Sequence, residues 1–547
     1  MPTLSVSKDA SEKYTTPLTE QDAAARRKAQ ISAKAKKSES RQRREKKRKK
    51  QEIMSEVTGW NIRTLIHALG DEVIEVRGNS GIVFGEITTD SRRITKDCVF
   101  IAIKGERFDG HDFVVQAAQA GAGVVIVERW QDTGCTQVLV RDTLEAYGRL
   151  AAVWRAQFAI PLICVVGSNG KTTTTQMIAS ILRTACGKEA IVATRGNFNN
   201  HIGVPQMLLE LNAGTKAAVI EAGMNHPGEM ARLVSWIRPT VVVITNAQRE
   251  HQEFLDGVEA SARENGLAIV ALSAKGTAVL PAKDKCLPLW GDLVRARGCR
   301  LLTYARGEAG TEADESTAIK ADITVSSSGT AGDEAIVIER RGLALDEAPQ
   351  TAEGGEGAGD SARMTSVLKL AGRHALHDAA AAAAASLAIG VRPEAVARGL
   401  ADFKPVAGRG VHYLLRNGAI LIDDAYNANP DSMRAAIDVL ADMPGPRVLV
   451  VGDMAETGSH AEDYHAEIGE YAKKRGIDRL LAAGEYMRFA VEAFGIGARH
   501  FETIEELTHA AQVAAQTPGT LLVKASNAAG LSRVVDAVKT AMSAKLV

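Results

Sequence analysis

Residues 165–182 read VVGSNGKTTTTQMIASIL: an apolar strand-like run, a turn that contains Gly167 and Gly170, and a helix-like segment that opens with Lys171 and Thr172. A glycine turn between a strand and a helix is the setting of a phosphate-binding loop. Its backbone amides can close around phosphate oxygens, and the helix N-terminus adds partial positive charge. Valine stands where the strict pattern G-x-x-x-x-G-K-[ST] has its first glycine, which leaves a simple helix N-cap turn as the alternative. The flanking strand and helix favour nucleotide binding.

The chain on either side of this loop alternates between strand-like and helix-like patterns. After the loop come the apolar runs AAVIEAG (217–223) and PTVVVITNA (239–247), each followed by a helix-like segment. This rhythm predicts βαβ units around a mostly parallel sheet. Later the pattern restarts with AILIDDAYNANP (419–430), RVLVVGDMAETG (447–458) and TLLVKASN (520–527). Three strand-plus-turn units at the end of a chain predict a separate Rossmann-like lobe.

The first 53 residues differ in charge from the rest. Residues 1–50 contain 16 Lys+Arg and 6 Asp+Glu, a net charge of +10, whereas the other 497 residues hold 50 basic and 60 acidic side chains, a net charge of −10. Residues 1–53 contain few large apolar side chains and cannot bury enough surface to offset their ordering entropy, so we expect a disordered basic leader. The expected domains are then 54–155, 156–404 and 405–547.

Composition narrows the class of protein. The six cysteines are scattered with no C-x-x-C pair, which fits free thiols in a reducing compartment. No apolar run reaches the roughly 20 residues of a membrane span, and no secretory signal is apparent. We expect a monomeric cytoplasmic protein. The leader allows three interpretations: a solvated tail, a segment that docks on anionic lipid, or a translation start at Met54 that excludes it.

The basic leader also suggests a nucleic-acid-associated P-loop protein, a rival from a different functional class. The folded body is acidic, aromatic residues make up only 4% of the chain, and no RNA-binding signature is present. Nucleic acid is therefore not an expected partner.

An ATP-using site needs carboxylates for magnesium, and several candidate functional residues lie near strand ends. Glu221 ends one apolar run and His251 follows the next, so both belong to the sheet edge at which α/β proteins bind ligands. Either could be a metal ligand, although a lone histidine is more often structural. Asp423 and Asp424 end a third run, and the spacing alone does not say which of the two acts.

These segments together resemble the Mur ligases, the ATP-dependent amide-bond-forming enzymes of peptidoglycan precursor synthesis. The resemblance rests on VVGSNGKTTT, TRGNFNNHIGVP, EAGMNHPGEM, TNAQREH, GRH, DDAYNANPDSM, VLVVGDMAETG and LVKAS, in this order over about residues 55–547. The segments TTDSRRITKDCVFIAIKGERFDGHDF (88–113) and YNANPDSM (426–433) are similar to the branch that joins D-alanyl-D-alanine to UDP-N-acetylmuramoyl-tripeptide. They argue against a folate or cyanophycin-type ligase, the runner-up.

The resemblance implies an α/β fold of three domains: a small N-terminal α/β domain that binds the UDP substrate, a central P-loop parallel-sheet ATPase domain and a C-terminal Rossmann-like ligase domain. It implies ATP and Mg²⁺ as cofactors. The implied reaction activates the tripeptide carboxylate as an acyl phosphate, which the amine of D-alanyl-D-alanine then attacks. This is the last cytoplasmic amino-acid-adding step of peptidoglycan precursor synthesis.

The resemblance also implies roles for individual residues. The ATP loop comprises Gly167, Ser168, Asn169, Gly170, Lys171, Thr172 and Thr173. Thr172 and Glu221 would hold one Mg²⁺, and His251 would serve a second. Arg409 and Asp424 would close over ATP, and the implied catalytic set is Lys171, Glu221, His251 and Asp424. Substrate contacts would come from Asp90, Ser91 and Arg92 for the uridine nucleotide, from Thr194, Asn197, Asn199 and Asn200 for the acceptor, and from Asn427, Asn429, Lys524 and Ser526 around the incoming amine and the acyl phosphate.

The chain departs from the family pattern in three places. Asn265 stands where many Mur ligases carry a carbamylated lysine, and because a neutral amide coordinates Mg²⁺ weakly, this implies a looser second metal site. The H-N-x-x-N-A segment reads HALHDA (374–379), which changes the adenine-side contacts. K-G-S-R reads KASN (524–527), which removes one cation near the product.

Overall fold

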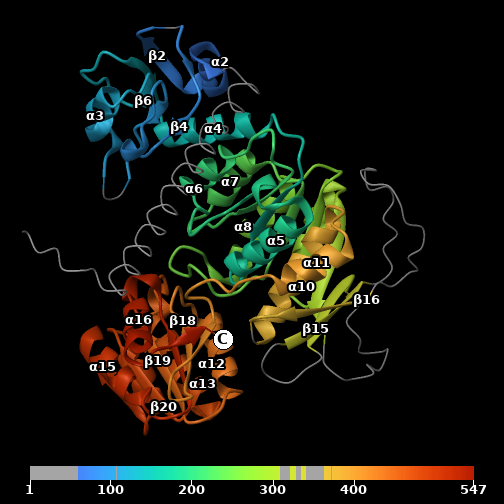
Figure 1. Ribbon diagram of the computed structural model, residues 1–547, viewed down its shortest axis with the longest axis vertical. Coiled ribbons are helices and arrows are strands. Elements are labelled where there is room, and N and C mark those ends of the chain that lie inside the picture. Colours follow the sequence, from blue (N-terminus) through green and yellow to red (C-terminus); the bar gives the residue numbers. More distant parts are fainter. Residues whose placement is uncertain are drawn as a thin grey trace, which may run out of the picture.

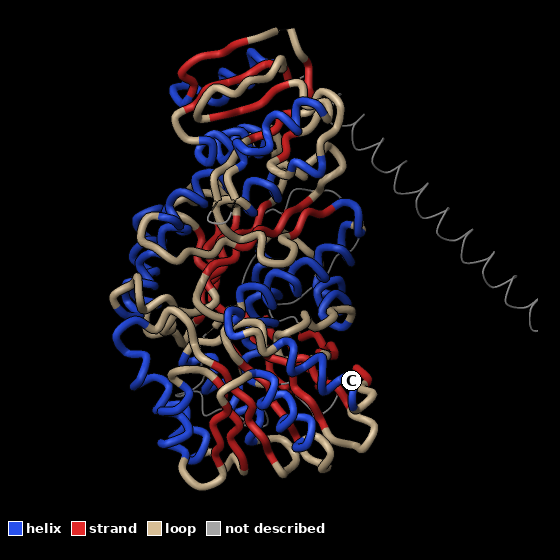
Figure 2. The backbone as a smooth tube through the Cα atoms, turned by 90° about the vertical axis from the view of Figure 1, so that its left-hand side faces the viewer, coloured by secondary structure: helices blue, strands red, loops and turns tan. Residues whose placement is uncertain are grey.

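The computed structural model describes residues 60–79, 81–105, 108–307, 321–327, 334–340, 363–370 and 372–546. The expected leader, 1–53, lies outside these residues. Three sheets, of five, nine and seven strands, follow one another along the chain, and a two-stranded ladder joins the first of them. Figure 1 shows them as three bodies stacked along the long axis, with the earliest residues at one end and the latest at the other. The side view keeps the same succession (Figure 2). The expected three-domain α/β fold is therefore present.

The first domain is built on a five-stranded sheet in the order β2-β7-β6-β5-β4. Its elements are α2 (Ile62–Leu69), β2 (Val73–Arg77), β4 (Ile87–Thr88), β5 (Val99–Ile101), α3 (Val114–Gln119), β6 (Val124–Val127), β7 (Thr136–Val140) and α4 (Thr143–Arg155). The apolar run 81–87 is divided between two strands, β3 and β4. Its first part, β3 (Val83–Phe84), pairs with β1 (Trp60–Asn61), because Phe84 packs on Trp60 with ring centroids 6.2 Å apart.

The central domain is a nine-stranded sheet in the order β16-β15-β14-β13-β12-β11-β8-β10-β9. Its strands are β8 (Leu162–Val166), β9 (Ile191–Ala193), β10 (Ala217–Glu221), β11 (Val241–Ile244), β12 (Thr277–Pro281), β13 (Arg300–Arg306), β14 (Ile323–Ser327), β15 (Glu334–Arg340) and β16 (Arg363–Leu368). Along the sheet from β9 to β14, through β10, β8, β11, β12 and β13, each pair of adjacent strands is parallel, whereas β15 pairs antiparallel with both β14 and β16. An antiparallel extension therefore completes the expected mostly parallel sheet at one edge.

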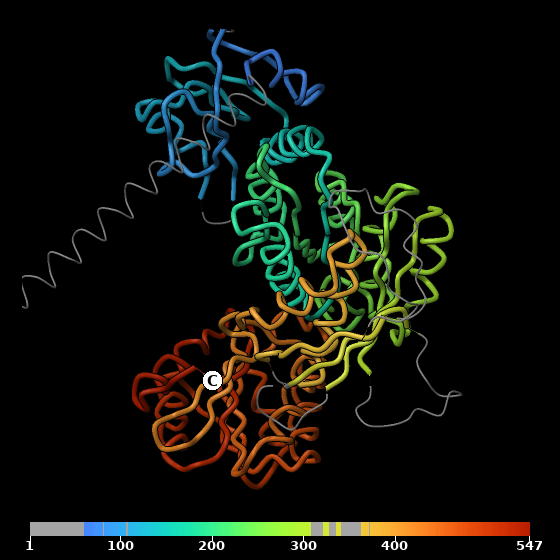
Figure 3. Tube along the Cα trace, turned by 45° about the vertical axis from the view of Figure 1, so that its right-hand side comes forward, coloured from blue at the N-terminus to red at the C-terminus, as the bar shows by residue number. Residues whose placement is uncertain are grey.

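Helices cover both faces of this sheet. They are α5 (Lys171–Cys186), α6 (Gly203–Leu208), α7 (Glu229–Ile237), α8 (Gly257–Val270), α9 (Leu287–Arg297), α10 (Arg373–Ala388) and α11 (Pro393–Ala401). Cys164 and Val166 of β8 belong to a core with α7, α8 and α9, whereas Ile163 and Val165 belong to a second core with α5 and α10. Burial on both faces explains why the strand reads as an unbroken apolar run. Figure 3 shows α10 and α11 beside α5.

The third domain is a seven-stranded sheet in the order β21-β20-β19-β22-β18-β17-β23. Its strands are β17 (Val411–Leu414), β18 (Ile420–Asp424), β19 (Arg447–Gly452), β20 (Arg479–Ala483), β21 (Ala498–Phe501), β22 (Thr520–Lys524) and β23 (Lys545–Leu546). The helices are α12 (Pro430–Ala441), α13 (Ala461–Lys474), α14 (Met487–Phe494), α15 (Ile504–Ala514) and α16 (Ser532–Ala541). The five adjacent strands β21, β20, β19, β22 and β18 all pair in parallel, as a Rossmann-like lobe requires.

The strand order decides which side chains can meet. Strand β8 lies at the interior of the central sheet between β10 and β11, so the loop after β8 opens between the ends of both neighbours. In the third domain β18 and β22 run in parallel register, with Asp424 opposite Lys524. Among the helices of the described residues, none has the length and apolar character needed to traverse a bilayer.

Candidate active site

The loop after β8 has the backbone of a phosphate-binding turn. Gly167 has φ +120° and Gly170 has φ +83°, both in the region that favours glycine. A Cβ atom on Gly167 would lie 2.3 Å from the Thr245 hydroxyl, and one on Gly170 would lie 2.3 Å from an Asp378 carboxylate oxygen. Both positions therefore exclude any larger residue, and the backbone amides of Gly167, Ser168 and Asn169 are hydrogen-bonded to residues of the central domain.

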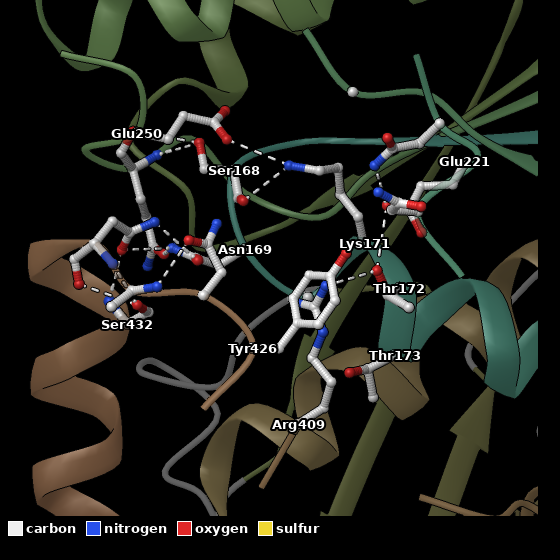
Figure 4. A pocket seen from close by; sticks show the side chains of 18 of the residues that line it. Ser168, Asn169, Lys171, Thr172, Thr173, Glu221, Glu250, Arg409, Tyr426 and Ser432 are labelled. Atoms are coloured by element: carbon white, nitrogen blue, oxygen red, sulfur yellow. Dashed lines mark hydrogen bonds and ion pairs between the residues drawn. The ribbon is translucent and has the colours of Figure 1, made fainter. Parts of the chain in front are cut away.

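Lys171 is the first residue of α5, and its amine reaches back over the loop. Its Nζ donates to the carbonyl oxygens of Gly167 at 2.5 Å and Ser168 at 3.0 Å, and to Glu250 Oε2 at 3.3 Å. Figure 4 shows the amine between Ser168 and Glu250. The Lys171 side chain is 16% exposed, so its charge is available to an anion that enters the loop.

The strand next to β8, β10, ends in a carboxylate that is suited to hold magnesium. Glu221 ends β10 and is 2% exposed. Its Oε1 accepts hydrogen bonds from Thr172 Oγ1 at 3.2 Å and Asn199 Nδ2 at 2.8 Å, and its backbone amide donates to Thr194 Oγ1 at 2.9 Å. Its Oε2 is buried and has no hydrogen-bond partner among the described residues. An orphaned buried oxygen beside a threonine hydroxyl and a phosphate loop is the donor set that Mg²⁺ takes together with phosphate.

The described residues hold no group of three or more His, Cys, Asp or Glu side chains arranged to bind a metal by themselves.

The loop opens into a cavity of about 1550 Å³ that residues of all three domains line. Most of the predicted site residues line it: Ser168, Asn169, Gly170, Lys171, Thr172, Thr173, Asn197, Asn199, Asn200, Glu221, His251, Arg409, Asp424, Asn427, Asn429, Lys524 and Ser526. The predicted residues that do not line it are Gly167, Asp90, Ser91, Arg92 and Thr194. Thr194 instead orients Glu221 from behind through its hydroxyl.

The predicted uridine segment lies in the first domain, beside the cavity. Asp90 accepts hydrogen bonds from the backbone amide of Arg92 at 3.0 Å and from its guanidinium at 2.8 and 3.0 Å. These bonds lower the pKa of Asp90. The Arg92 side chain is 87% exposed. The neighbouring Thr89 lines the cavity, as does Phe108, an aromatic side chain that is 72% exposed. The segment thus lies next to a residue that lines the cavity, with the Arg92 side chain exposed.

The third domain presents an ion pair to the cavity, with Lys524 buried and Asp424 partly buried. Lys524 Nζ donates to Asp424 Oδ2 at 2.8 Å and to the carbonyl oxygen of Asn427 at 2.8 Å. The adjacent Asp423 points elsewhere: it accepts from the backbone amides of Gly408 and Ala425, and burial raises its pKa. The structure thus separates two aspartates that the sequence left equivalent, because only Asp424 lines the cavity.

Two predicted residues bridge the central and third domains at the loop. Arg409 Nη2 donates to Thr172 Oγ1 at 3.1 Å, and its guanidinium lies 4.0 Å from the centre of the Tyr426 ring. Asn429, the N-cap of α12, exchanges two hydrogen bonds with Asn169, of 3.0 and 3.2 Å. Phosphate loop and C-terminal lobe are therefore in direct contact (Figure 4).

The sequence analysis missed two residues of the segment that follows β11. Arg249 donates to Asp431 of α12 at 2.7 Å and to Glu467 of α13 at 2.7 Å. Glu250, 5% exposed, is the acceptor opposite Lys171. Both belong to TNAQREH, but their roles depend on partners far away in the sequence.

His251, the predicted ligand of a second metal, contacts the third domain. Its Nδ1 is hydrogen-bonded to Glu456 Oε2 and its Nε2 lies 3.8 Å from Glu250 Oε2. The hydrogen bond from His251 lowers the pKa of Glu456.

Three Mur ligase family models match in order: the catalytic domain over residues 84–154, the middle domain over 165–386 and the glutamate ligase domain over 408–527. The UDP-N-acetylmuramoyl-tripeptide–D-alanyl-D-alanine ligase of Escherichia coli is 37% identical over 466 residues, which cover 85% of this chain and 96% of that enzyme. This chain belongs to the Mur ligase family. The Bacillus subtilis ligase of the same name is 32% identical over 84% of this chain and 94% of its own length.

Solved Mur ligase structures share the fold. A crystal structure of MurF from Acinetobacter baumannii superposes with a TM-score of 0.74 at 29% identity, covering 88% of this chain and 99% of that one. MurF from Thermotoga maritima in complex with ADP has a TM-score of 0.69 at 23% identity, covering 84% and 98%. The Mur ligase architecture thus extends over nearly the whole length of these relatives.

Proposed function

We propose that this Mur ligase is an ATP-dependent amide-bond ligase that joins D-alanyl-D-alanine to UDP-N-acetylmuramoyl-tripeptide. The γ-phosphoryl group of ATP passes to the terminal tripeptide carboxylate, which gives an acyl phosphate and ADP. The dipeptide amine attacks the acyl carbon and loses a proton, the C–O bond to phosphate breaks, and amide and inorganic phosphate leave. The curated relatives from Escherichia coli and Bacillus subtilis carry the name of this activity.

The observation that carries the proposal is the meeting of two half-sites across one cavity. The phosphate loop with Lys171 and the Thr172–Glu221 pair lies on the central domain, and the Asp424–Lys524 pair lies on the third. A ligase of this type must bring a phosphoryl donor, a carboxylate and an amine together, and a cavity of about 1550 Å³ is large enough for several reactants.

The residues of the loop supply the electrostatics for phosphoryl transfer. Both the carboxylate and ATP are anionic, so their approach needs positive charge, which Lys171 and the start of α5 provide. Thr172 and Glu221 would hold Mg²⁺, which supplies further neutralisation of the phosphate oxygens when it is bound. Glu221 is fixed in place by Asn199 and Thr194. No covalent intermediate with the protein is required, so positioning accounts for much of the rate.

Contacts between domains keep the reaction from water. An acyl phosphate hydrolyses readily, so the site has to be closed before it forms. Arg409 and Asn429 reach the phosphate loop from the third domain, and Arg249 reaches the third domain from the central one. We propose that residues 54–155 bind the UDP end of the acceptor, 156–404 bind ATP and 405–547 bind the dipeptide. We place the reaction in the cytoplasm, where ATP is available and the six free cysteines would stay reduced.

Phosphate release tests this proposal. Purified protein is supplied with ATP, Mg²⁺, D-alanyl-D-alanine and UDP-N-acetylmuramoyl-tripeptide that ends in either diaminopimelate or lysine, and each component is omitted in turn. We expect release only with the full set, together with a pentapeptide product by mass spectrometry. ATP turnover that does not respond to D-alanyl-D-alanine would refute the substrate assignment, and stimulation by RNA or DNA would favour the nucleic-acid rival.

A further inference from the structure

The amine of Lys171 uses all of its hydrogens inside the protein. An ammonium group carries three N–H donors, and Lys171 Nζ donates to the carbonyl oxygens of Gly167 and Ser168, at 2.5 and 3.0 Å, and to Glu250 Oε2, at 3.3 Å. The two carbonyl groups belong to the phosphate loop and move with it, whereas Glu250 belongs to the segment after β11. A phosphate oxygen can therefore bind the amine only when one of these acceptors gives way.

Glu250 is the acceptor that a phosphate would replace. Its bond to Nζ is the longest of the three, and a carboxylate and a phosphate at one ammonium repel each other. The repulsion is strong because Glu250 is buried and lines the cavity, and the Lys171 side chain is itself mostly buried, so water screens these charges little. The carboxylate therefore takes up the positive charge that an entering phosphate needs.

Asn265, in α8, fixes Glu250 relative to the loop. Its Nδ2 donates toward Glu250 Oε1 at 3.4 Å and to the Ser261 carbonyl at 2.9 Å, and its Oδ1 accepts from the backbone amide of Gly167 at 2.9 Å. Asn265 is 1% exposed. Because one buried side chain contacts both the loop and the carboxylate, Glu250 stays beside Lys171 when the loop binds a ligand, and it stays close enough to compete for the amine.

From this arrangement we infer that Glu250 is a positioning residue that competes with phosphate for Lys171 and so weakens nucleotide binding. Glu250 holds the amine over the loop, and a nucleotide gains the amine when its phosphate displaces the carboxylate. The same contact favours release of ADP after each turnover, because the carboxylate regains Lys171 as the phosphate leaves. The inference rests on the proposed ATP-dependent function, but it concerns the strength of nucleotide binding rather than the reaction.

Calorimetric titration with ADP tests the inference without reference to turnover. EDTA is present, so that no divalent cation contributes to the affinity. Glu250→Gln keeps the shape of the side chain and removes its charge, and we expect it to bind ADP about tenfold more tightly than wild type. Loss of a merely structural contact would weaken binding or leave it unchanged. The matched control is Glu253→Gln, which removes the same charge from an exposed side chain three positions further along, and its affinity should stay within about twofold of wild type.

Two further measurements separate charge from shape and from folding. Glu250→Asp keeps the charge, so its affinity for ADP should stay closer to that of wild type than to that of Glu250→Gln. A crystal structure of the wild-type chain with ADP needs no variant, and it should show Lys171 Nζ on a phosphate oxygen with Glu250 Oε2 more than about 4 Å away.

Equal or weaker binding of ADP by Glu250→Gln would overturn the inference. So would a wild-type complex in which Nζ keeps Glu250 while it binds phosphate. In a chain that is active as a ligase, either result would leave the proposed function intact. A wild-type chain that binds no ADP, with or without Mg²⁺, would overturn both.

Discussion

Arg249→Met should weaken the docking of the C-terminal lobe on the central domain. Arg249 donates to both Asp431 and Glu467, and its guanidinium lies 5.2 Å from the centre of the Tyr464 ring. We call the set Arg249, Asp431 and Glu467 the interdomain latch. Methionine keeps much of the length and apolar stem of arginine but removes every hydrogen bond of the guanidinium, so the change isolates the ionic part of the contact.

The magnitude follows from burial and geometry. The three side chains of the latch are 22%, 25% and 28% exposed. A hydrogen bond to a charged group contributes about 1.5–3 kcal/mol when well buried, but partial exposure and side-chain entropy reduce this. We expect the variant to lose about 2 kcal/mol of docking free energy for the whole latch, a change of about 30-fold in the ratio of docked to undocked lobes. If chemistry requires the docked state, kcat/KM should fall by up to that factor.

The matched control is Arg434→Met. Arg434 donates to the same Glu467 at 2.8 Å, but both residues belong to the third domain, so this bond cannot hold the domains together. Steady-state phosphate release gives kcat/KM, and small-angle X-ray scattering gives the radius of gyration without ligand. We expect Arg249→Met to expand the particle and lower kcat/KM, with little change for Arg434→Met. Equal kcat/KM and equal radii of gyration for the two variants would refute the reasoning. So would a loss of kcat/KM of less than twofold for Arg249→Met.

Three further outcomes can be checked. Gly170→Ala should abolish binding of ADP measured by calorimetry, because its Cβ would lie 2.3 Å from a buried carboxylate, whereas Gly187→Ala, with φ +93° but open space, should cost only about 1–3 kcal/mol of stability. Asn265→Ala leaves the Gly167 amide unpaired and should lower the unfolding free energy in urea by about 1–3 kcal/mol. Hydrogen bonds from Arg249 lower the pKa of Glu467 below 4.5. The contribution of Glu467 to docking is therefore complete above pH 4.5 and should be lost as the pH falls through the lowered pKa. Small-angle scattering should show this loss as an expansion of the particle.

Much of the fold could be predicted because its signals are local. A buried strand (Leu162–Val166), a turn with two glycines at positive φ and the start of a helix at Lys171 follow one another directly in the sequence. Glu221 and the pair Asp423 and Asp424 are predictable as candidates because strand ends are recognisable and the ends of parallel strands meet at one edge. The division of run 81–87 was not predictable in this way, since Phe84 leaves the sheet to pack on Trp60.

The residues that sequence analysis missed depend on contacts between distant parts of the chain. Glu250 and Arg249 have no periodic pattern and no strand end of their own. Glu250 is hydrogen-bonded to Lys171, 79 positions away, and Arg249 is hydrogen-bonded to Glu467, 218 positions away. The choice between Asp423 and Asp424 is likewise tertiary, because it depends on the backbone amide of Gly408. A charged residue inside an irregular segment carries no local sign of which domain it will face.

The segment after β11 contacts both the phosphate loop and the third domain, so we expect ligand binding and domain docking to be coupled. Its even-numbered side chains face the phosphate loop: Asn246 and Gln248 bond Asn169, and Glu250 bonds Lys171. Arg249 and His251, between and beyond them, face the third domain. A shift of this segment that improves one set of contacts must move the other, because consecutive residues share a backbone. Occupation of the loop is therefore felt at the lobe interface, and loss of the latch should weaken nucleotide binding as well as turnover.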